Sequence, residues 1–201
     1  MNEIVVYQLK NGLYTQVPHI LEVLALHIIR LEGYTTEGIF RISGDGNDVM
    51  KLRTELQKGN YSCPIDNVHN AATLFKLFLR ELAEPVFPTH FYPTALRVAE
   101  EGNVSGMHEM ISQFDNINVK VIQFVVNFLL SFLKPNYIAK TMMTSGNMAT
   151  VFAPTLLRCP SDNPLMQITA ATSEVKFVTL LLDKFPSDLK VDITKLLSTT
   201  Q

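Results

Sequence analysis

Three stretches of the chain hold polar or charged residues that helix packing alone does not require. The first is EGIFRISG at 37–44, where Gly38 and Gly44 bracket Arg41. Glycines allow backbone conformations closed to other residues, so this loop can present a long side chain in an unusual direction. Held in this way, Arg41 could act as a fixed cation toward a bound group. The alternative is that Arg41 is an ordinary exposed arginine. The neighbouring apolar residues are expected to anchor the loop to the core: Ile39, Phe40 and Ile42.

The second stretch is LFKLFLRELAEP at 74–85, which carries two cations four residues apart. Lys76 and Arg80 therefore emerge beside each other on one helix face, opposite the apolar stripe, where they repel mildly. A solvated face would also explain them, with Glu84 forming a weak ion pair to Arg80 worth a few tenths of a kcal/mol. The alternative is that this pair of cations serves a site.

The third stretch is TSGNMATVFAPTLLR at 144–158, in which Asn147 lies among apolar and small residues. A buried asparagine must be hydrogen-bonded. Asn147 is thus expected either to tie the core together or to face a binding site.

Motifs for self-contained catalysis are missing from the sequence. There is no GxxxxGK[ST] loop, GxSxG elbow or HExxH helix, and the five histidines have no ligand spacing. The DGND segment at 45–48 resembles the start of a calcium loop, but the twelfth position is Leu56 instead of a glutamate. It is better explained as turn and cap chemistry, and no metal site is expected.

Helical periodicity dominates the elements that must position these stretches. The apolar spacing and the Gly and Pro signals predict an all-α, single-domain bundle of about eight helices. The predicted helices lie near 17–33, 49–58, 68–82, 89–101, 104–114, 118–133, 141–152 and 172–185. The helix at 118–133 is apolar nearly all round and should run through the centre of the bundle. The only strand candidate is NEIVVYQL at 2–9.

Composition narrows the class of partner and the compartment. The 201 residues suit one domain, with 47% hydrophobic and 18% charged residues. A net charge of −2 gives no overall positive electrostatic potential that would attract nucleic acid or an anionic membrane. The longest apolar runs are too short or interrupted to span a bilayer, and no secretory signal opens the chain. With two widely separated cysteines, Cys63 and Cys159, we expect a cytoplasmic, monomeric domain with reduced thiols that does not insert into membranes.

Taken together and in order, the three stretches resemble a known family. EGIFRISG, KLFLRELAEPVFP and NMATVFAPTLLR are similar to the three signature blocks of the RhoGAP domain family, and their separations match. The resemblance covers roughly residues 17–186, which leaves 1–16 as an N-terminal extension and 187–201 as a C-terminal tail. VFAPTLLRCPSDNP further resembles the RhoGAP module of Vilse-type proteins that also carry a MyTH4 domain.

The resemblance implies a role for each of the singled-out residues. Arg41 would be an arginine finger inserted in trans into a GTP-bound small GTPase of Rho, Rac or Cdc42 type. By the same resemblance Lys76 contacts the GTPase, Arg80 bonds to the backbone of the loop that carries Arg41, and Asn147 contacts the GTPase switch region. The chain would be an activator and no enzyme by itself, and it would need no cofactor because GTP and magnesium belong to the partner.

Three positions depart from the family pattern, and two other functions stay open. Ala83 replaces a proline, Ala153 replaces a glycine, and Met142 replaces a common lysine near the expected docking groove, which could alter the preferred GTPase. A module that binds the GTPase without accelerating hydrolysis is one alternative, and a helical scaffold unrelated to GTPases is another. The presence of Arg41 favours the activator.

Overall fold

The computed structural model describes Met1 and residues 16–193, and this part of the chain is built from helices without strands. The all-α prediction is confirmed, while the strand candidate at 2–9 lies outside the described residues. The helices are α2 (His19–Arg30), α3 (Gly46–Gln57), α4 (Val68–Arg80), α5 (Tyr92–Glu101), α6 (Val104–Ser112), α7 (Asn116–Phe132), α8 (Pro135–Thr141), α9 (Ser145–Leu156) and α10 (Pro164–Asp183). Three short 3-10 turns complete them: η1 (Gly33–Thr35), η2 (Thr89–Phe91) and η3 (Ser187–Leu189).

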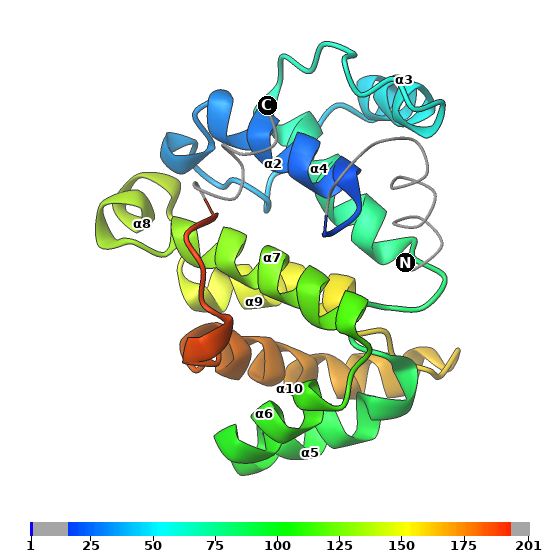
Figure 1. The fold of residues 1–201 in the computed structure, drawn as a ribbon, viewed down its shortest axis with the longest axis vertical. Helices are drawn as coiled ribbons and strands as arrows, with labels where there is room; N and C mark the ends of the chain where they lie inside the picture. Colours follow the sequence, from blue (N-terminus) through cyan, green and yellow to red (C-terminus); the bar gives the residue numbers. More distant parts are fainter. Residues whose placement is uncertain (2–15, 194–201) are drawn as a thin grey trace.

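The helices stack in three tiers (Figure 1). α2 and α4 pack together at one end, with α3 against α4. α7 and α9 run through the middle, and α9 contacts α4 on one side and α10 on the other. α5 and α6 close the opposite end beneath α10. The helices that carry the second and third polar stretches, α4 and α9, are therefore direct neighbours.

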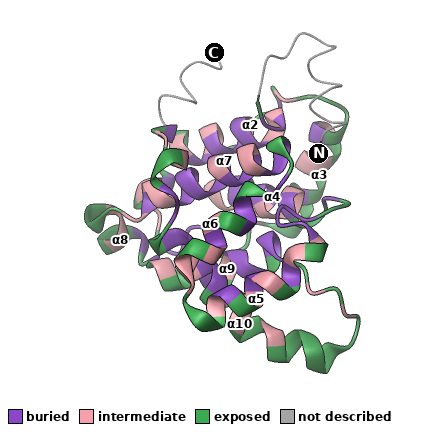
Figure 2. Ribbon diagram, turned by 60° about the horizontal axis from the view of Figure 1, so that its bottom comes forward, coloured by how far each residue is buried: buried purple, intermediate pink, exposed green. Residues whose placement is uncertain are grey.

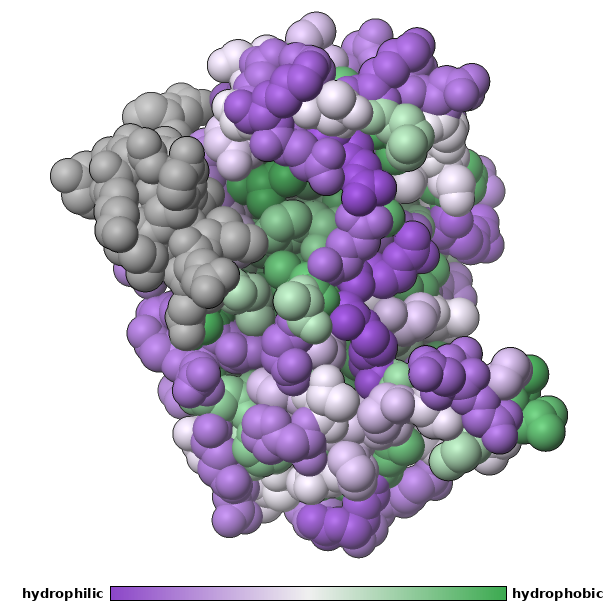
Figure 3. Space-filling model, turned by 90° about the vertical axis from the view of Figure 1, so that its right-hand side faces the viewer, coloured by the Kyte–Doolittle hydropathy of each residue, from purple (hydrophilic) through white to green (hydrophobic). Residues whose placement is uncertain are grey.

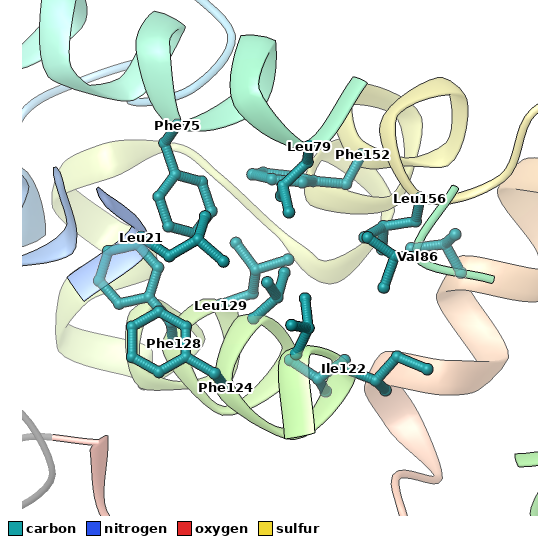
Figure 4. Close-up of a cluster of buried hydrophobic side chains, with 14 of the residues drawn as sticks. Leu21, Phe75, Leu79, Val86, Ile122, Phe124, Phe128, Leu129, Phe152 and Leu156 are labelled. Carbon is teal, nitrogen blue, oxygen red and sulfur yellow. The ribbon is translucent and has the colours of Figure 1, made fainter. Parts of the chain in front are cut away.

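Aromatic and leucine side chains from every tier meet in one core, as Figure 4 shows for Phe75 of α4, Phe128 of α7 and Phe152 of α9. All three phenylalanines are fully buried. Burying each such side chain is worth about 1.5–3 kcal/mol. α7 is buried along almost its whole length, which confirms the prediction that the apolar helix runs through the centre.

Side-chain caps begin α3, which follows the segment that carries Arg41, and α4, which packs against it. The Asp45 side chain accepts hydrogen bonds from the backbone N–H groups of Asn47 and Asp48 and so caps α3. Asn67 caps α4 in the same way. These caps satisfy donors that a helix N-terminus leaves free, and the cap interpretation of the DGND segment is confirmed.

Three boundaries differ from the sequence-based prediction. α8 was not predicted, and it forms a separate short helix opened by Pro135. α9 continues through Pro154 to Leu156, because the missing N–H lies on the exposed side, where the Thr150 carbonyl can face solvent. α10 begins at Pro164, eight residues before the predicted start at 172. Its first turns stand clear of the body (Figure 2), so no periodic buried face marks them in the sequence.

α10 combines this exposed start with a buried end. Leu165 and Ile168 are 73% and 72% exposed, whereas Phe177 and Leu181 are fully buried. Within the described residues, α10 is the one unbroken helix long and apolar enough by composition to cross a membrane, a property that core helices of globular proteins share. The apolar tip is visible in Figure 3. The apolar runs considered in the sequence do not include this helix start, and α10 reaches that length because it begins at Pro164.

Residues 187–193, expected as part of a tail, pack on α7. Asn127 of α7 donates to the carbonyl of Leu189 at 2.9 Å and accepts from the N–H of Val191 at 3.0 Å. Ile193 is buried against the core. The described part of this segment is thus held to the domain.

Candidate functional site

Phe40 sets the direction of the loop between η1 and α3, residues 36–45, here called the Arg41 loop. Its ring is fully buried, with edge contacts to Phe132 and Phe152 at centroid distances of 5.2 and 5.3 Å. Its backbone has φ of 66°, which costs about 1–3 kcal/mol for a residue with a Cβ. Burial of the ring and its aromatic contacts offset that cost. The turn places Arg41 outside the core directly after an anchored residue.

Gly38 closes the turn from within. Its carbonyl accepts hydrogen bonds from the backbone N–H groups of Arg41 and Ile42, both at 2.9 Å. Its own N–H donates to the carbonyl of Thr141, the last residue of α8, at 2.7 Å. Gly38 has φ of +66°, a conformation that favours glycine. The loop is therefore tied to the segment that connects α8 with α9.

Gly44 fastens the other end of the Arg41 loop to α4. Its N–H donates to Oγ1 of Thr73, and the N–H of Asp45 donates to Oδ1 of Asn70, both at 2.9 Å. A Cβ on Gly44 would lie 2.3 Å from Oδ1 and 2.8 Å from Cα of Asn70. Close approach of two backbones is the reason why this position needs glycine.

Lys76 binds the centre of the loop. Its Nζ donates to the carbonyl oxygen of Phe40. Partial burial, together with the nearby charge of Arg80, lowers the pKa of the Lys76 ammonium below its ordinary value. The loop is thus held by α4 at three points along one face: Asn70, Thr73 and Lys76.

The bond to the loop backbone comes from Lys76 and not from Arg80 as the resemblance implied, while the expected contact of Lys76 with the GTPase stays a prediction. Four residues further along α4, Arg80 lies about 6 Å closer to the helix end. Its side chain is exposed and makes no hydrogen bond or ion pair with any described residue. The backbone carbonyl of Arg80 accepts a hydrogen bond from Nη2 of Arg158 at 2.5 Å. Arg80 therefore contacts the segment that follows α9.

Asn147 is exposed in the first turn of α9 and does not tie the core together. Its Nδ2 donates to the carbonyl of Met142 at 2.9 Å. Met142 ends α8 in the left-handed conformation, with φ of 58°, and is 55% exposed. The residue that replaces a family lysine is therefore at the surface, beside the residue that binds Gly38.

Arg41 itself is exposed, and its guanidinium forms no ion pair with any residue in the described part of the chain. The Nη2 atom lies 3.3 Å from the position that a Cβ on Gly38 would occupy. Ile39 and Phe40 anchor the loop as expected, but Ile42 is 45% exposed, so the prediction that it anchors the loop is wrong. Because Phe40 has a positive φ, the chain turns after it and the Ile42 side chain points away from the core.

The structure also shows support residues that the sequence analysis missed. Arg158 spans from α9 to the end of α4, where it donates to the carbonyls of Arg80 and Leu82. Asn70 and Thr73, three residues apart, were a detectable sign of a polar strip on α4. Among the described residues, no three His, Cys, Asp or Glu side chains lie close enough together to hold a metal ion.

The surface beyond α4 is apolar where α2, α3 and α4 meet. A groove of about 440 Å³ is lined there by residues that include Ile20, Leu56, Leu77 and Phe78. Figure 3 shows this face of the molecule, with apolar side chains gathered between hydrophilic ridges. The groove lies on the opposite flank of α4 from Lys76 and is separate from the Arg41 loop.

Comparison with known proteins shows which family the chain resembles. A model of the RhoGAP domain matches residues 18–161. GTPase activating protein homolog 3 of Dictyostelium discoideum is 31% identical over 186 residues, which cover 92% of this chain and 14% of that protein. Human Rho GTPase-activating protein 24 is 30% identical over 176 residues, covering 81% of this chain and 23% of that protein. The chain therefore spans less than a quarter of the length of these relatives.

Solved structures show the same fold. The crystal structure of human Rho GTPase activating protein 15 superposes with a TM-score of 0.74 at 22% identity, covering 87% of this chain and 84% of that chain. The BH domain of GRAF, the GTPase regulator associated with focal adhesion kinase, superposes with a TM-score of 0.69. The helical architecture and the match over residues 18–161 lead to one conclusion: the chain belongs to the RhoGAP domain family.

Proposed function

We propose that this domain activates GTP hydrolysis by a Rho-type small GTPase and that Arg41 is the residue it inserts into the partner's site. The observation that carries the proposal is an exposed arginine without an ion pair in the described structure, on a loop whose backbone is fixed from α4 and from α8. Relatives named as GTPase-activating proteins support the class of activity.

The chemistry suits a guanidinium. Transfer of the γ-phosphoryl group spreads negative charge over its oxygens and the leaving bridge oxygen, and a planar guanidinium can bind two of these oxygens at once. Arginine fingers of this kind are worth about 10³ to 10⁵ in rate, or roughly 4–7 kcal/mol of transition-state stabilisation. The nucleotide, magnesium and attacking water belong to the GTPase.

A loop that is fixed before the partner binds increases the transition-state stabilisation that Arg41 can supply. A donor already held in place costs no reorganisation when charge develops. Backbone groups of Gly38, Phe40, Gly44 and Asp45 bond to α8 or α4, outside the Arg41 loop. The side chain of Arg41 has none among the described residues, so its guanidinium stays available.

The contacts around Arg41 support proposed roles for the remaining residues. Lys76 is engaged by the loop backbone, which leaves Arg80 as the exposed cation on α4 that can meet an acidic or polar group of the GTPase. Met142 and Ile42 add exposed apolar area beside the loop. We propose that the loss of a cation at position 142 shifts preference among Rho, Rac and Cdc42 proteins.

Single-turnover hydrolysis by a panel of Rho, Rac and Cdc42 proteins tests the function. The wild-type domain is expected to accelerate at least one of them strongly. Arg97→Ala is a matched control, since Arg97 is an exposed arginine of α5, at the opposite end of the molecule (Figure 1), and among the described residues its ion pair is with Glu101. No acceleration across the panel would refute the activator and would leave a binding module as the surviving alternative.

A further inference from the structure

The connection from α8 to α9 contains a residue in an unfavourable backbone conformation that its own side chain does not explain. Met142 has φ of 58°, although a residue with a Cβ is disfavoured there and glycine is the usual choice at the end of a helix. Its side chain is 55% exposed, so burial does not hold it in place. Something else must stabilise the left-handed turn.

Asn147 supplies part of that stabilisation, together with Oγ1 of Thr141, which accepts from the backbone N–H of Met143 at 3.2 Å. Its Nδ2 donates to the Met142 carbonyl at 2.9 Å, while its backbone N–H donates to Oγ1 of Thr144, the cap of α9, at 3.2 Å. The N–H of Met142 donates to the carbonyl of Ile138 at 2.9 Å. The peptide groups on both sides of Met142 Cα are therefore held, one by α8 and the other by Asn147 at its carbonyl and by the Thr141 hydroxyl at its N–H.

The turn held in this way also supports the Arg41 loop. The carbonyl of Thr141 belongs to the peptide that joins Thr141 to Met142, and it accepts from the Gly38 N–H at 2.7 Å. Thr141 is fully buried, so no water competes for this bond. If Met142 leaves the left-handed conformation, this peptide must rotate or α9 must move, and Gly38 loses its acceptor.

We propose that Asn147 is a positioning residue for Arg41. Asn147 acts on the Arg41 loop through Met142, Thr141 and Gly38. This assignment differs from the direct GTPase contact that the family resemblance implies for Asn147. It rests on the proposed function only where activity is concerned, because the hydrogen bonds are present in the free domain. The loop is then held from two sides, by Lys76 of α4 and by Asn147 of α9.

The first test needs no GTPase. Amide hydrogen exchange at Gly38 is measured by NMR in the free wild-type domain, in Asn147→Ala and in Asn147→Asp, which keeps the shape but cannot donate. Loss of one hydrogen bond is expected to speed Gly38 exchange about 3- to 10-fold. Thr150→Ala is the matched control, since Thr150 is exposed three residues further along α9 and bonds only to Gly146 within the helix.

The second test asks whether Asn147 acts through the backbone of Met142. Glycine at position 142 adopts positive φ without support, so Asn147→Ala in a Met142→Gly background is expected to change Gly38 exchange less than twofold. In single-turnover hydrolysis, Asn147→Ala should lower the rate at saturating domain about 3- to 10-fold and leave the half-saturating concentration almost unchanged. The Met142→Gly background should remove most of this loss as well.

Two results of the Gly38 exchange measurement would overturn the positioning role. One is an unchanged Gly38 exchange rate in both Asn147 variants, and the other is an equally large Asn147→Ala effect in the Met142→Gly background. A raised half-saturating concentration with a normal saturating rate would assign Asn147 to direct contact instead. If the wild-type domain accelerated no GTPase while Gly38 exchange behaved as expected, the proposed function would fail and the positioning of the loop would stand.

Discussion

Gly44→Ala is the substitution whose effect the structure defines most sharply. The added Cβ would lie 2.3 Å from Oδ1, 2.8 Å from Cα and 2.9 Å from N of Asn70. Two of these atoms belong to the backbone of α4, so a side-chain rotation cannot relieve the clash. The Arg41 loop must move away from α4, and the bonds from Gly44 to Thr73 and from Asp45 to Asn70 must lengthen or break.

The size of the effect follows from these contacts. Each lost hydrogen bond is worth about 1 kcal/mol, and forcing an extra carbon into a packed site costs about 1–3 kcal/mol. Together they predict a loss of about 3–5 kcal/mol in unfolding free energy. For a chain of this length, 1 kcal/mol corresponds to about 2–4 °C, so the melting temperature should fall by roughly 6–20 °C.

Thermal unfolding by circular dichroism measures the change, with Gly46→Ala as the matched control. Gly46 lies two residues further on, at the start of α3, and a Cβ there meets nothing within 4 Å. This control should shift the melting temperature by less than about 2 °C. Equal melting temperatures for the two variants would refute the close-approach argument, and with it the claim that the Arg41 loop is fastened to α4 through Gly44.

Three further predictions concern the supports of the loop and of the core. Lys76→Met should lower the unfolding free energy by about 1.5–3 kcal/mol in urea titrations, because a charge-assisted hydrogen bond to the loop is lost. Arg80→Met should change the unfolding free energy by less than about 0.5 kcal/mol. A larger loss for Arg80→Met than for Lys76→Met would show that Arg80 makes the bond to the loop. Tyr92→Phe removes the 2.5 Å hydrogen bond that the buried Glu174 accepts and should cost about 1–3 kcal/mol, part of which Glu174→Gln recovers; a loss below about 0.5 kcal/mol contradicts the assignment. Burial lowers the pKa of His27 below its ordinary value of 6.5, so the unfolded chain binds this proton more readily and stability should fall as pH drops below about 6.5; an equally steep fall in His27→Gln would show that His27 is not responsible.

Helix identity could be predicted from sequence because the apolar pattern records burial. The predicted helix at 68–82 matches α4 (Val68–Arg80), and the apolar run at 118–133 matches α7 (Asn116–Phe132). The start of α10 could not be predicted in this way. Its first turns are exposed although they carry Leu165 and Ile168, so their apolar residues have no period to detect.

The residues Arg41, Lys76, Arg80 and Asn147 were singled out from sequence, but their contacts and the supporting side chains of Asn70, Thr73 and Arg158 were not. Lys76 and Arg80 differ by about 40° around α4 and about 6 Å along it, and only the packed position of the Arg41 loop decides which of them reaches it. Ile42 was expected to be buried, and the positive φ of Phe40 turns it outward. That conformation is set by burial of the Phe40 ring among residues distant in sequence, which no local pattern contains.

Lys76, Asn70 and Thr73 show that the side chains which fix a loop can lie far from it in the sequence. All three side chains come from α4, some 30 residues after the loop they hold. Their spacing along one helix face is ordinary for a solvated strip. Only the meeting of that strip with the backbone of Gly44 and Phe40 gives it a role.

The saturating rate of GTP hydrolysis tests the central claim most directly. An excess of wild-type or Arg41→Ala domain is mixed with a GTP-loaded Rho-family protein that the wild type activates, and both the single-turnover rate and the binding affinity are measured. We predict a fall of at least 10³-fold in the rate at saturation, with affinity changed by less than about tenfold. An Arg41→Ala domain that retains the wild-type rate at saturation would contradict the account.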